Sequence, residues 1–181
     1  MTLTGFNELD RAAAVELLVS CCPSTGWAAS VADARPFVDA ESALAEAERL
    51  WTLRPADERL AAIVAHPPIG GLSAATARER HEQAGAAHAD RSTREALAAL
   101  NEDYRDRFGY VFLTDASGRE ATDMLAELRT RLANTAEQER ANAEEHQRRI
   151  MRRRLHRAII GPPPLLVSTH VLDTAAGAGD R

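Results

Sequence analysis

The sequence contains few aromatic residues, almost no cysteine and no long apolar run. Only 4% of its 181 residues are aromatic, and alanine and leucine dominate the apolar set, which favours helices over sheets. The two cysteines, Cys21 and Cys22, are adjacent and have no CxxC or zinc-ligand spacing, so we expect reduced, buried helix residues. No apolar run is long enough to cross a bilayer, and the N-terminus lacks the basic and apolar blocks of a signal peptide. We therefore expect a soluble, cytoplasmic protein with no membrane partner.

Motifs of several common sites are also missing. The six histidines form no HxH, HxxH or HExxH pattern, so we expect no metal site. The chain has no GxGxxG, GxxxxGK[ST] or GxSxG motif, which argues against nucleotide-binding folds and nucleophile elbows. The net charge of −5 argues against a general nucleic-acid binder.

What is present is the pattern of one helical domain. A composition of 45% hydrophobic and 27% charged residues is that of a globular protein. Apolar residues recur at helical spacing between capping and helix-breaking residues. The sequence therefore predicts an all-α fold, a compact single-domain bundle of about eight helices. The expected helices run from Asn7 to Cys22, from about Trp27 to Arg35, from Asp39 to Trp51, from Pro55 to His66, from Ser73 to Gly85, from Ser92 to Gly109, from Arg119 to Leu132, and from Thr135 to before Gly161.

Particular residues mark the ends of these helices. The expected N-terminal signals are Asn7 and Asp39 as N-caps and the capping boxes Ser92–Glu95 and Thr135–Gln138. Gly109 is expected to end a helix, and residues 110–113 to follow it as a short, buried, extended segment.

One histidine stands at a helix end, before two prolines. Pro67 and Pro68 lack a backbone N–H, and Pro67 disfavours the helical conformation for His66. His66 is therefore held on a stiff edge and not on a helix face. Two interpretations remain open from these residues alone: a helix-terminal histidine that caps carbonyl groups, and an acid/base group.

Two further charged positions could complete a catalytic set with His66. Glu82, followed by Gln83, lies in a short helix that ends at glycine, and Arg154 lies beside the apolar stripe of the last helix. A histidine, a carboxylate and a fixed cation suit acid/base chemistry on an anionic substrate. Taken singly, each has a simpler explanation, Glu82 as a solvated carboxylate and Arg154 as one of six basic surface residues. That arginine cluster could also bind nucleic acid, although nearby acidic residues partly neutralise it.

A set of short motifs follows a fixed order between about residues 6 and 160. The motifs are Trp27, Arg35-Pro36-Phe37, Ala65-His66-Pro67-Pro68-Ile69-Gly70, Glu82-Gln83-Ala84-Gly85, Leu100-Asn101-x-x-Tyr104-x-x-Arg107-Phe108-Gly109-Tyr110-Val111-Phe112, Arg131-Leu132-x-Asn134 followed by Glu139, and Ile150-x-x-x-Arg154-Leu155. In this order they resemble the 2-oxo-4-hydroxy-4-carboxy-5-ureidoimidazoline (OHCU) decarboxylases of urate breakdown.

The resemblance implies an all-helical lyase without cofactor or metal, often a homodimer, that converts OHCU to (S)-allantoin and CO2. It implies His66 as the catalytic acid/base, with Glu82 and Arg154 at the other active-site positions. Backbone N–H and C=O groups after Gly109 would bind the ureido group or ring amide, which a helix could not offer. The substrate-binding positions that follow are Pro67, Glu79, Gln83, Val111, Phe112, Leu113 and Thr114.

Two positions depart from the family pattern. Glu79 stands where the family often has serine, and Tyr110-Val111 stands where it commonly has Phe-Pro. A second carboxylate beside Glu82 would repel an anionic substrate. Glu79 therefore keeps one alternative open, a catalytically inactive binding or regulatory protein that retains the helical fold.

The last twenty residues differ from the rest of the chain. Residues 1–161 form the expected helical domain, and a proline run then begins a linker. Residues 166–177 resemble the first strand of the transthyretin-like 5-hydroxyisourate hydrolases, with His170 at that family's histidine. We expect residues 162–181 to be a disordered linker with a truncated hydrolase-like tail. The same resemblance suggests a functional link to a 5-hydroxyisourate hydrolase.

Overall fold

Eight helices account for most of the residues that the structure describes. The computed structural model describes residues 1–66, 90–116 and 118–160, and these ranges contain no β-strand. The helices are α1 (Leu3–Glu8), α2 (Arg11–Cys21), α3 (Thr25–Asp33), α4 (Ala40–Thr52), α5 (Ala56–Val64), α8 (Arg91–Phe108), α9 (Ala121–Arg131) and α10 (Ala136–Ile160). The prediction of an all-α fold is confirmed. The helix expected over residues 73–85 and the tail expected after residue 161 lie outside the described residues.

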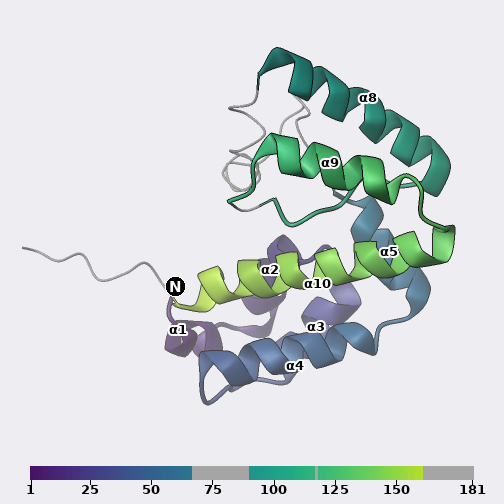
Figure 1. Cartoon of the computed structure of the whole chain (residues 1–181). Helices are drawn as coiled ribbons and strands as arrows, with labels where there is room; N and C mark the ends of the chain where they lie inside the picture. Colours follow the sequence, from purple (N-terminus) through teal and green to yellow (C-terminus); the bar gives the residue numbers. More distant parts are fainter. Residues whose placement is uncertain (67–89, 117, 161–181) are drawn as a thin grey trace, which may run out of the picture.

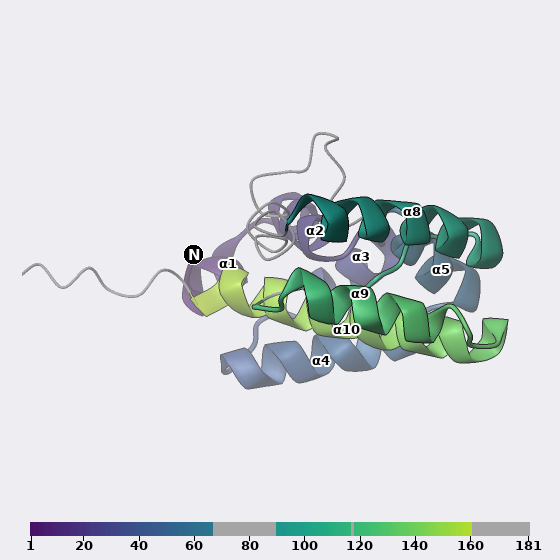
Figure 2. The ribbon, with the colours of Figure 1, turned by 45° about the horizontal axis from the view of Figure 1, so that its top comes forward.

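The longest helix, α10, runs through the middle of the molecule. It packs against α1, α2, α4 and α5, while α8 and α9 lie together on the side opposite α4 (Figure 1). The turned view keeps this arrangement (Figure 2). With 25 residues, α10 is about 37 Å long, long enough to contribute to two separate cores.

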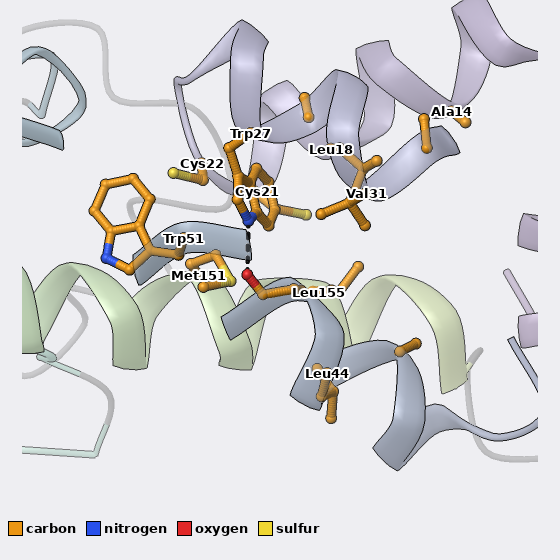
Figure 3. Close-up of a cluster of buried hydrophobic side chains, with 14 of the residues drawn as sticks. Ala14, Leu18, Cys21, Cys22, Trp27, Val31, Leu44, Trp51, Met151 and Leu155 are labelled. Carbon is orange, nitrogen blue, oxygen red and sulfur yellow. Dashed lines mark hydrogen bonds between the residues drawn. The ribbon is translucent and has the colours of Figure 1, made fainter. Parts of the chain in front are cut away.

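The first of these cores, which we call the N-terminal core, joins α1–α4 to the C-terminal half of α10. At its centre Trp27 is fully buried, and its indole N–H donates a 2.9 Å hydrogen bond to the carbonyl oxygen of Ala47 (Figure 3). The many alanines let the helices approach closely around this ring. Its buried members are Phe6, Ala14, Leu18, Cys21, Cys22, Trp27, Ala28, Val31, Ala32, Ala43, Leu44, Ala47, Trp51, Ala62, Met151, Leu155 and Ile159.

The second core, which we call the aromatic core, packs α8 and α9 against α5 and the N-terminal half of α10. The Tyr104 ring centroid lies 4.8 Å from that of Phe108 and 5.6 Å from that of Phe112. Gly109 ends α8 with a φ of 82°, a left-handed conformation that glycine adopts without a Cβ clash, as predicted. The buried members are Ile63, Leu97, Tyr104, Tyr110, Phe112, Leu113, Ala116, Ala121, Met124, Leu125, Leu128, Ala143 and Ile150.

One predicted capping box is confirmed and one is wrong. The Thr135 N–H donates to Gln138 Oε1 at 2.9 Å, and the Gln138 N–H donates to Thr135 Oγ1 at 3.2 Å. In α8, by contrast, the N-cap is Asp90, whose carboxylate accepts a 2.9 Å bond from the Thr93 N–H. The N-cap therefore lies two residues before the predicted cap at Ser92.

The prediction that Asn7 starts a helix is also wrong. Two helices stand where one was expected. Thr2 is the N-cap of α1, and Asp10 is the N-cap of α2. The Asn7 amide instead binds the backbone of Phe37, donating to its carbonyl at 2.9 Å and accepting from its N–H at 3.0 Å. Asn7 therefore ties α1 to the chain just before α4.

The length of α10 does not make it a membrane helix. Its surface carries ion pairs, such as Glu145 with Arg149 at 2.8 Å and Glu144 with Arg140 at 2.7 Å. None of the helices in the described ranges is both long enough and apolar enough to cross a membrane.

Candidate active site

His66 lies at the end of α5, directly after the C-cap residue Ala65. Its backbone N–H donates a 3.2 Å hydrogen bond to the carbonyl of Ile63, which tightens the last turn. The side chain is partly buried, and its Nε2 lies 2.6 Å from Oε1 of Gln147 on α10. Two elements distant in sequence therefore meet at this ring.

Gln147 has no exposed surface, and both ends of its amide are bound inside the protein. Its nitrogen donates a 3.2 Å hydrogen bond to the sulfur of Cys22. Burial raises the pKa of the Cys22 thiol to about 12, so this sulfur stays protonated and neutral at physiological pH. Cys22 is therefore a neutral anchor for Gln147, consistent with the predicted buried cysteine.

Arg154 lies two turns after Gln147 on the same buried face of α10, about 10 Å further along the axis. Only 8% of Arg154 is exposed. Burial is the largest influence on the pKa of Cys22, and the nearby positive charge of Arg154 opposes it. We call these four residues, His66, Gln147, Cys22 and Arg154, the His66 cluster. Two of its members, His66 and Arg154, are predicted site residues.

The segment from Tyr110 to Asp115, which we call the 110–115 segment, is non-helical, and residues 110–114 are buried, as predicted for residues 110–113. Two of its backbone groups bind the protein itself, each at 3.0 Å. The Phe112 N–H donates to the side-chain oxygen of Asn101, and the Leu113 carbonyl accepts from Arg131. The backbone N–H groups of Leu113 and Thr114 make no hydrogen bond within the described parts of the chain. These two N–H groups, like that of Val111, are therefore candidates to bind substrate.

The 110–115 segment is fixed to α10 beside the His66 cluster. The Asp115 N–H donates a 3.2 Å hydrogen bond to Nδ1 of His146, and the Asp115 carboxylate forms an ion pair with Arg153. His146 and Arg153 directly precede Gln147 and Arg154 in the sequence. One stretch of α10 therefore holds both the His66 cluster and the predicted backbone-binding segment.

A buried ionic network binds the 110–115 segment. Glu139 has no exposed surface and accepts hydrogen bonds from Arg131 and Asn134, each at 2.8 Å, and from the Tyr104 hydroxyl. Burial alone would raise the pKa of Glu139, but these donors outweigh it and hold the pKa below its usual range. Burial, followed by the bond to Glu139, raises the pKa of Tyr104. Because Arg131 also binds the Leu113 carbonyl, the network holds the segment in shape.

The remaining predicted site residues cannot be placed. Pro67, Glu79, Glu82 and Gln83 lie outside the described residues, so their roles stay predictions. Within the residues that are described, no three His, Cys, Asp or Glu side chains gather as metal ligands would.

Part of the arginine-rich face of α10 serves to hold helices together. Arg148 and Arg152 both form ion pairs with Glu48 on α4, the second at 2.8 Å. Arg152 also pairs with Glu41 at 2.9 Å. These cations therefore have an internal structural role.

Comparison with known proteins gives consistent results. Residues 7–156 match the OHCU decarboxylase family. The OHCU decarboxylase of Amia calva is 30% identical over 90% of this chain and 97% of its own length. The uric acid degradation bifunctional protein of Bacillus subtilis (strain 168) is 31% identical over 85% of this chain, which spans only 32% of that protein. A crystal structure of OHCU decarboxylase in the presence of (S)-allantoin has a TM-score of 0.67 and 29% identity, covering 76% of this chain and 92% of the other.

The fold and these matches define a helical decarboxylase domain. The chain belongs to the OHCU decarboxylase family, because the match covers most of its length. The matched residues include every motif that carries the resemblance. Residues 162–181 lie beyond the match. The chain spans about a third of the length of the bifunctional relatives that it matches.

Proposed function

We propose that this chain decarboxylates OHCU to (S)-allantoin and CO2 in urate breakdown. Family membership, the names of the relatives and the similarity to a structure obtained in the presence of (S)-allantoin support this proposal. The structural observation that carries it is the His66 cluster. There the His66 imidazole is bound through Gln147 to Cys22, and the buried Arg154 lies on the same face of α10 as Gln147.

The substrate carries its own electron sink. When the carbon–carbon bond to the carboxylate breaks, CO2 leaves and the electron pair stays on the ring. The adjacent imidazoline C=N and carbonyl system accepts that pair, so the reaction needs charge stabilisation and one proton. Delivery of the proton to a single face of the ring gives one enantiomer of allantoin. We therefore propose a reaction without metal or organic cofactor.

The roles of the residues follow from this chemistry. Arg154 orients the anionic substrate, because a buried guanidinium offers fixed donors in a planar fork. His66 handles the hydroxyl proton and protonates the ring carbon. By resemblance, Glu82 sets the charge of His66, and Pro67, Glu79 and Gln83 lie beside the substrate. The backbone of residues 111–114 binds the ureido group or the ring amide.

A coupled assay tests this function. OHCU is generated from urate in situ with urate oxidase and 5-hydroxyisourate hydrolase, and optically active allantoin is followed by circular dichroism. We expect His66→Ala to lower the rate about 10²- to 10⁴-fold, the usual contribution of general acid–base catalysis. His156→Ala is the matched control, because His156 is exposed on α10. A wild-type rate equal to that of buffer, or equal rates for wild type and His66→Ala, would overturn the proposal.

Two more substitutions separate the roles. Arg154→Lys keeps the charge but loses the fork, so we expect KM to rise more than kcat falls. Glu79→Ser should lower KM if Glu79 lines the site. If the wild type binds (S)-allantoin calorimetrically but has no activity, the inactive binding protein is the better description.

Two expectations about partners belong to the same proposal. By resemblance we propose a homodimer, which sedimentation equilibrium would test against a monomer mass of 19.7 kDa. We also propose a functional link to a 5-hydroxyisourate hydrolase, because two relatives are bifunctional urate-degrading proteins. Faster turnover when the hydrolase supplies OHCU than when OHCU is supplied chemically would support this link.

A further inference from the structure

Gln147 is an unusual residue to find fully buried at this place. Its sequence neighbours Glu145 and Arg148 are charged, yet Gln147 itself has no exposed surface. A buried amide must have both ends bound, or the unbound end costs free energy. Here the oxygen lies 2.6 Å from His66 Nε2 and the nitrogen lies 3.2 Å from Cys22 Sγ.

The donor and acceptor roles in these two hydrogen bonds determine which nitrogen of the imidazole carries the proton. An amide oxygen can only accept a hydrogen bond, so the atom facing it, Nε2 of His66, must carry a hydrogen. A neutral imidazole has a single N–H, and Nδ1 then carries the lone pair. In the structure the Cys22 sulfur accepts the amide N–H of Gln147, which leaves the amide oxygen for His66.

We propose that Gln147 is a positioning residue that holds His66 in the tautomer with the proton on Nε2. This inference rests on the proposed function, in which the His66 imidazole handles the protons of the substrate. Gln147 is anchored on the buried face of α10, and through it the same helix sets the ring orientation of His66 and carries Arg154. One helix therefore fixes the guanidinium directly and orients the imidazole through Gln147.

The tautomer can be measured directly on the protein without turnover. Two-bond ¹H–¹⁵N correlation spectra of the ¹⁵N-labelled full chain, assigned with His66→Ala, distinguish a protonated nitrogen from one with a lone pair. Above the His66 pKa we expect the Nε2–H pattern in the wild type and a mixture of tautomers in Gln147→Leu. The opposite amide orientation, in which Cys22 donates to the oxygen, gives the Nδ1–H pattern. That result would overturn the proposal.

Kinetic variants test the positioning role by a second route. Gln147→Glu places a carboxylate against Nε2, which stabilises the imidazolium, so the limb of the pH–rate profile set by His66 should move up by about one pH unit or more. Gln147→Leu should lower kcat on the order of 10²-fold by releasing the ring, with a smaller change in KM. An unchanged pH profile in Gln147→Glu, with the variant folded, would contradict the proposal.

The anchor provides variants that leave Gln147 in place. Cys22→Ser retains a hydroxyl oxygen that can accept the amide N–H, whereas Cys22→Ala does not. We expect Cys22→Ser to keep the wild-type tautomer and Cys22→Ala to lose part of it; equal spectra for the two would count against the anchor. Asn7→Ala is the matched control, because it removes another structural amide that binds the Phe37 backbone far from His66. It should lower stability without moving the pH profile.

The two proposals can fail separately. If the Nε2–H tautomer is found and the protein does not decarboxylate OHCU, Gln147 still positions His66 and the proposed function is wrong. If decarboxylation is found with the Nδ1–H tautomer, the function stands and the positioning proposal is wrong.

Discussion

The two cores of this protein are built by different means. The N-terminal core is held by alanine, leucine and tryptophan packing, with the Trp27 indole bound to a backbone carbonyl at its centre. The aromatic core instead surrounds a buried ionic network of Arg131, Glu139 and Tyr104. Apolar packing tolerates small shifts, whereas a buried charge needs fixed partners. The core next to the 110–115 segment is therefore the one with the more specific geometry.

The two cores support the candidate site in different ways. The N-terminal core supports α10 as a platform, and the ionic network shapes the 110–115 segment through the bond from Arg131 to the Leu113 carbonyl. Several motif residues that carry the family resemblance, among them Tyr104, Arg131 and Glu139, belong to that network. Their role here is to hold backbone in place.

The largest effect is expected from breaking the ionic network. Glu139→Ala leaves the guanidinium of Arg131 buried without its main partner, which should cost about 3–5 kcal/mol of unfolding free energy. It should also lower kcat by loosening the 110–115 segment. Urea denaturation and the coupled assay measure both. Glu137→Ala, an exposed carboxylate in the same helix turn, is the control; a cost within about 1 kcal/mol of this control would show that the network is not critical.

A cavity in the N-terminal core should affect stability alone. Leu18 is fully buried, so Leu18→Ala should cost about 2–5 kcal/mol of unfolding free energy. Because Leu18 binds neither the His66 cluster side chains nor the 110–115 segment, kcat of the folded variant should stay near the wild-type value. Leu53→Ala is the control, since that side chain is 59% exposed, and should change stability by less than about 0.5 kcal/mol. A loss of kcat in the folded Leu18→Ala variant would show that the two cores do not have separate roles.

Acid should weaken the aromatic core. The pKa of Glu139 is lowered by Arg131 and that of Glu127 by His146 and Arg119, despite burial that would raise both. A lowered folded-state pKa gives stability that is present above the ordinary value of 4.5 and is lost as pH falls through the lowered pKa. Unfolding free energies from pH 7 to pH 3 should fall in the wild type, and Glu139→Gln should flatten this fall. Leu18→Ala should lower the unfolding free energy by the same amount at every pH. A flattened fall with pH in Leu18→Ala would contradict the difference between the two cores.

The smallest effect is expected at the surface between α10 and α4. Arg152→Ala removes the ion pairs to Glu41 and Glu48, yet the Arg152 side chain is 34% exposed, so the cost should be only about 0–1 kcal/mol. The cost should shrink in high salt. Arg149→Ala, whose pair lies within α10, serves as control. A cost above about 2 kcal/mol would mean that this contact, and not apolar packing, holds the N-terminal core.

The sequence predicted those helix ends whose signals are local. The Asp39 N-cap, the glycine stop at Gly109 and the Thr135–Gln138 box each involve residues within a few positions of one another. Asn7 failed as a predicted cap because its amide is engaged by Phe37, thirty residues away in sequence. Ser92 failed because a stronger cap, Asp90, stands two residues earlier.

The site could be predicted only in part, for the same reason. His66 was visible because two prolines mark it, and Arg154 because it borders an apolar stripe. Gln147 was missed, since a glutamine among charged residues resembles a solvated one. The available signal was spacing: Ala143, Gln147 and Met151 follow one another at four-residue intervals on the buried face of α10. What periodicity could not supply is the partner, because His66 reaches Gln147 only in the folded chain.

The placement of the scarce aromatic residues has a practical consequence. Both tryptophans, Trp27 and Trp51, lie in the N-terminal core, and both tyrosines, Tyr104 and Tyr110, lie in the aromatic core. Indole absorbs at longer wavelengths than phenol, so each core carries its own chromophore. The long-wavelength edge of a near-UV spectrum of the unlabelled protein therefore reports the N-terminal core alone, whereas shorter wavelengths report both cores. Following the two regions together shows which half orders first during refolding.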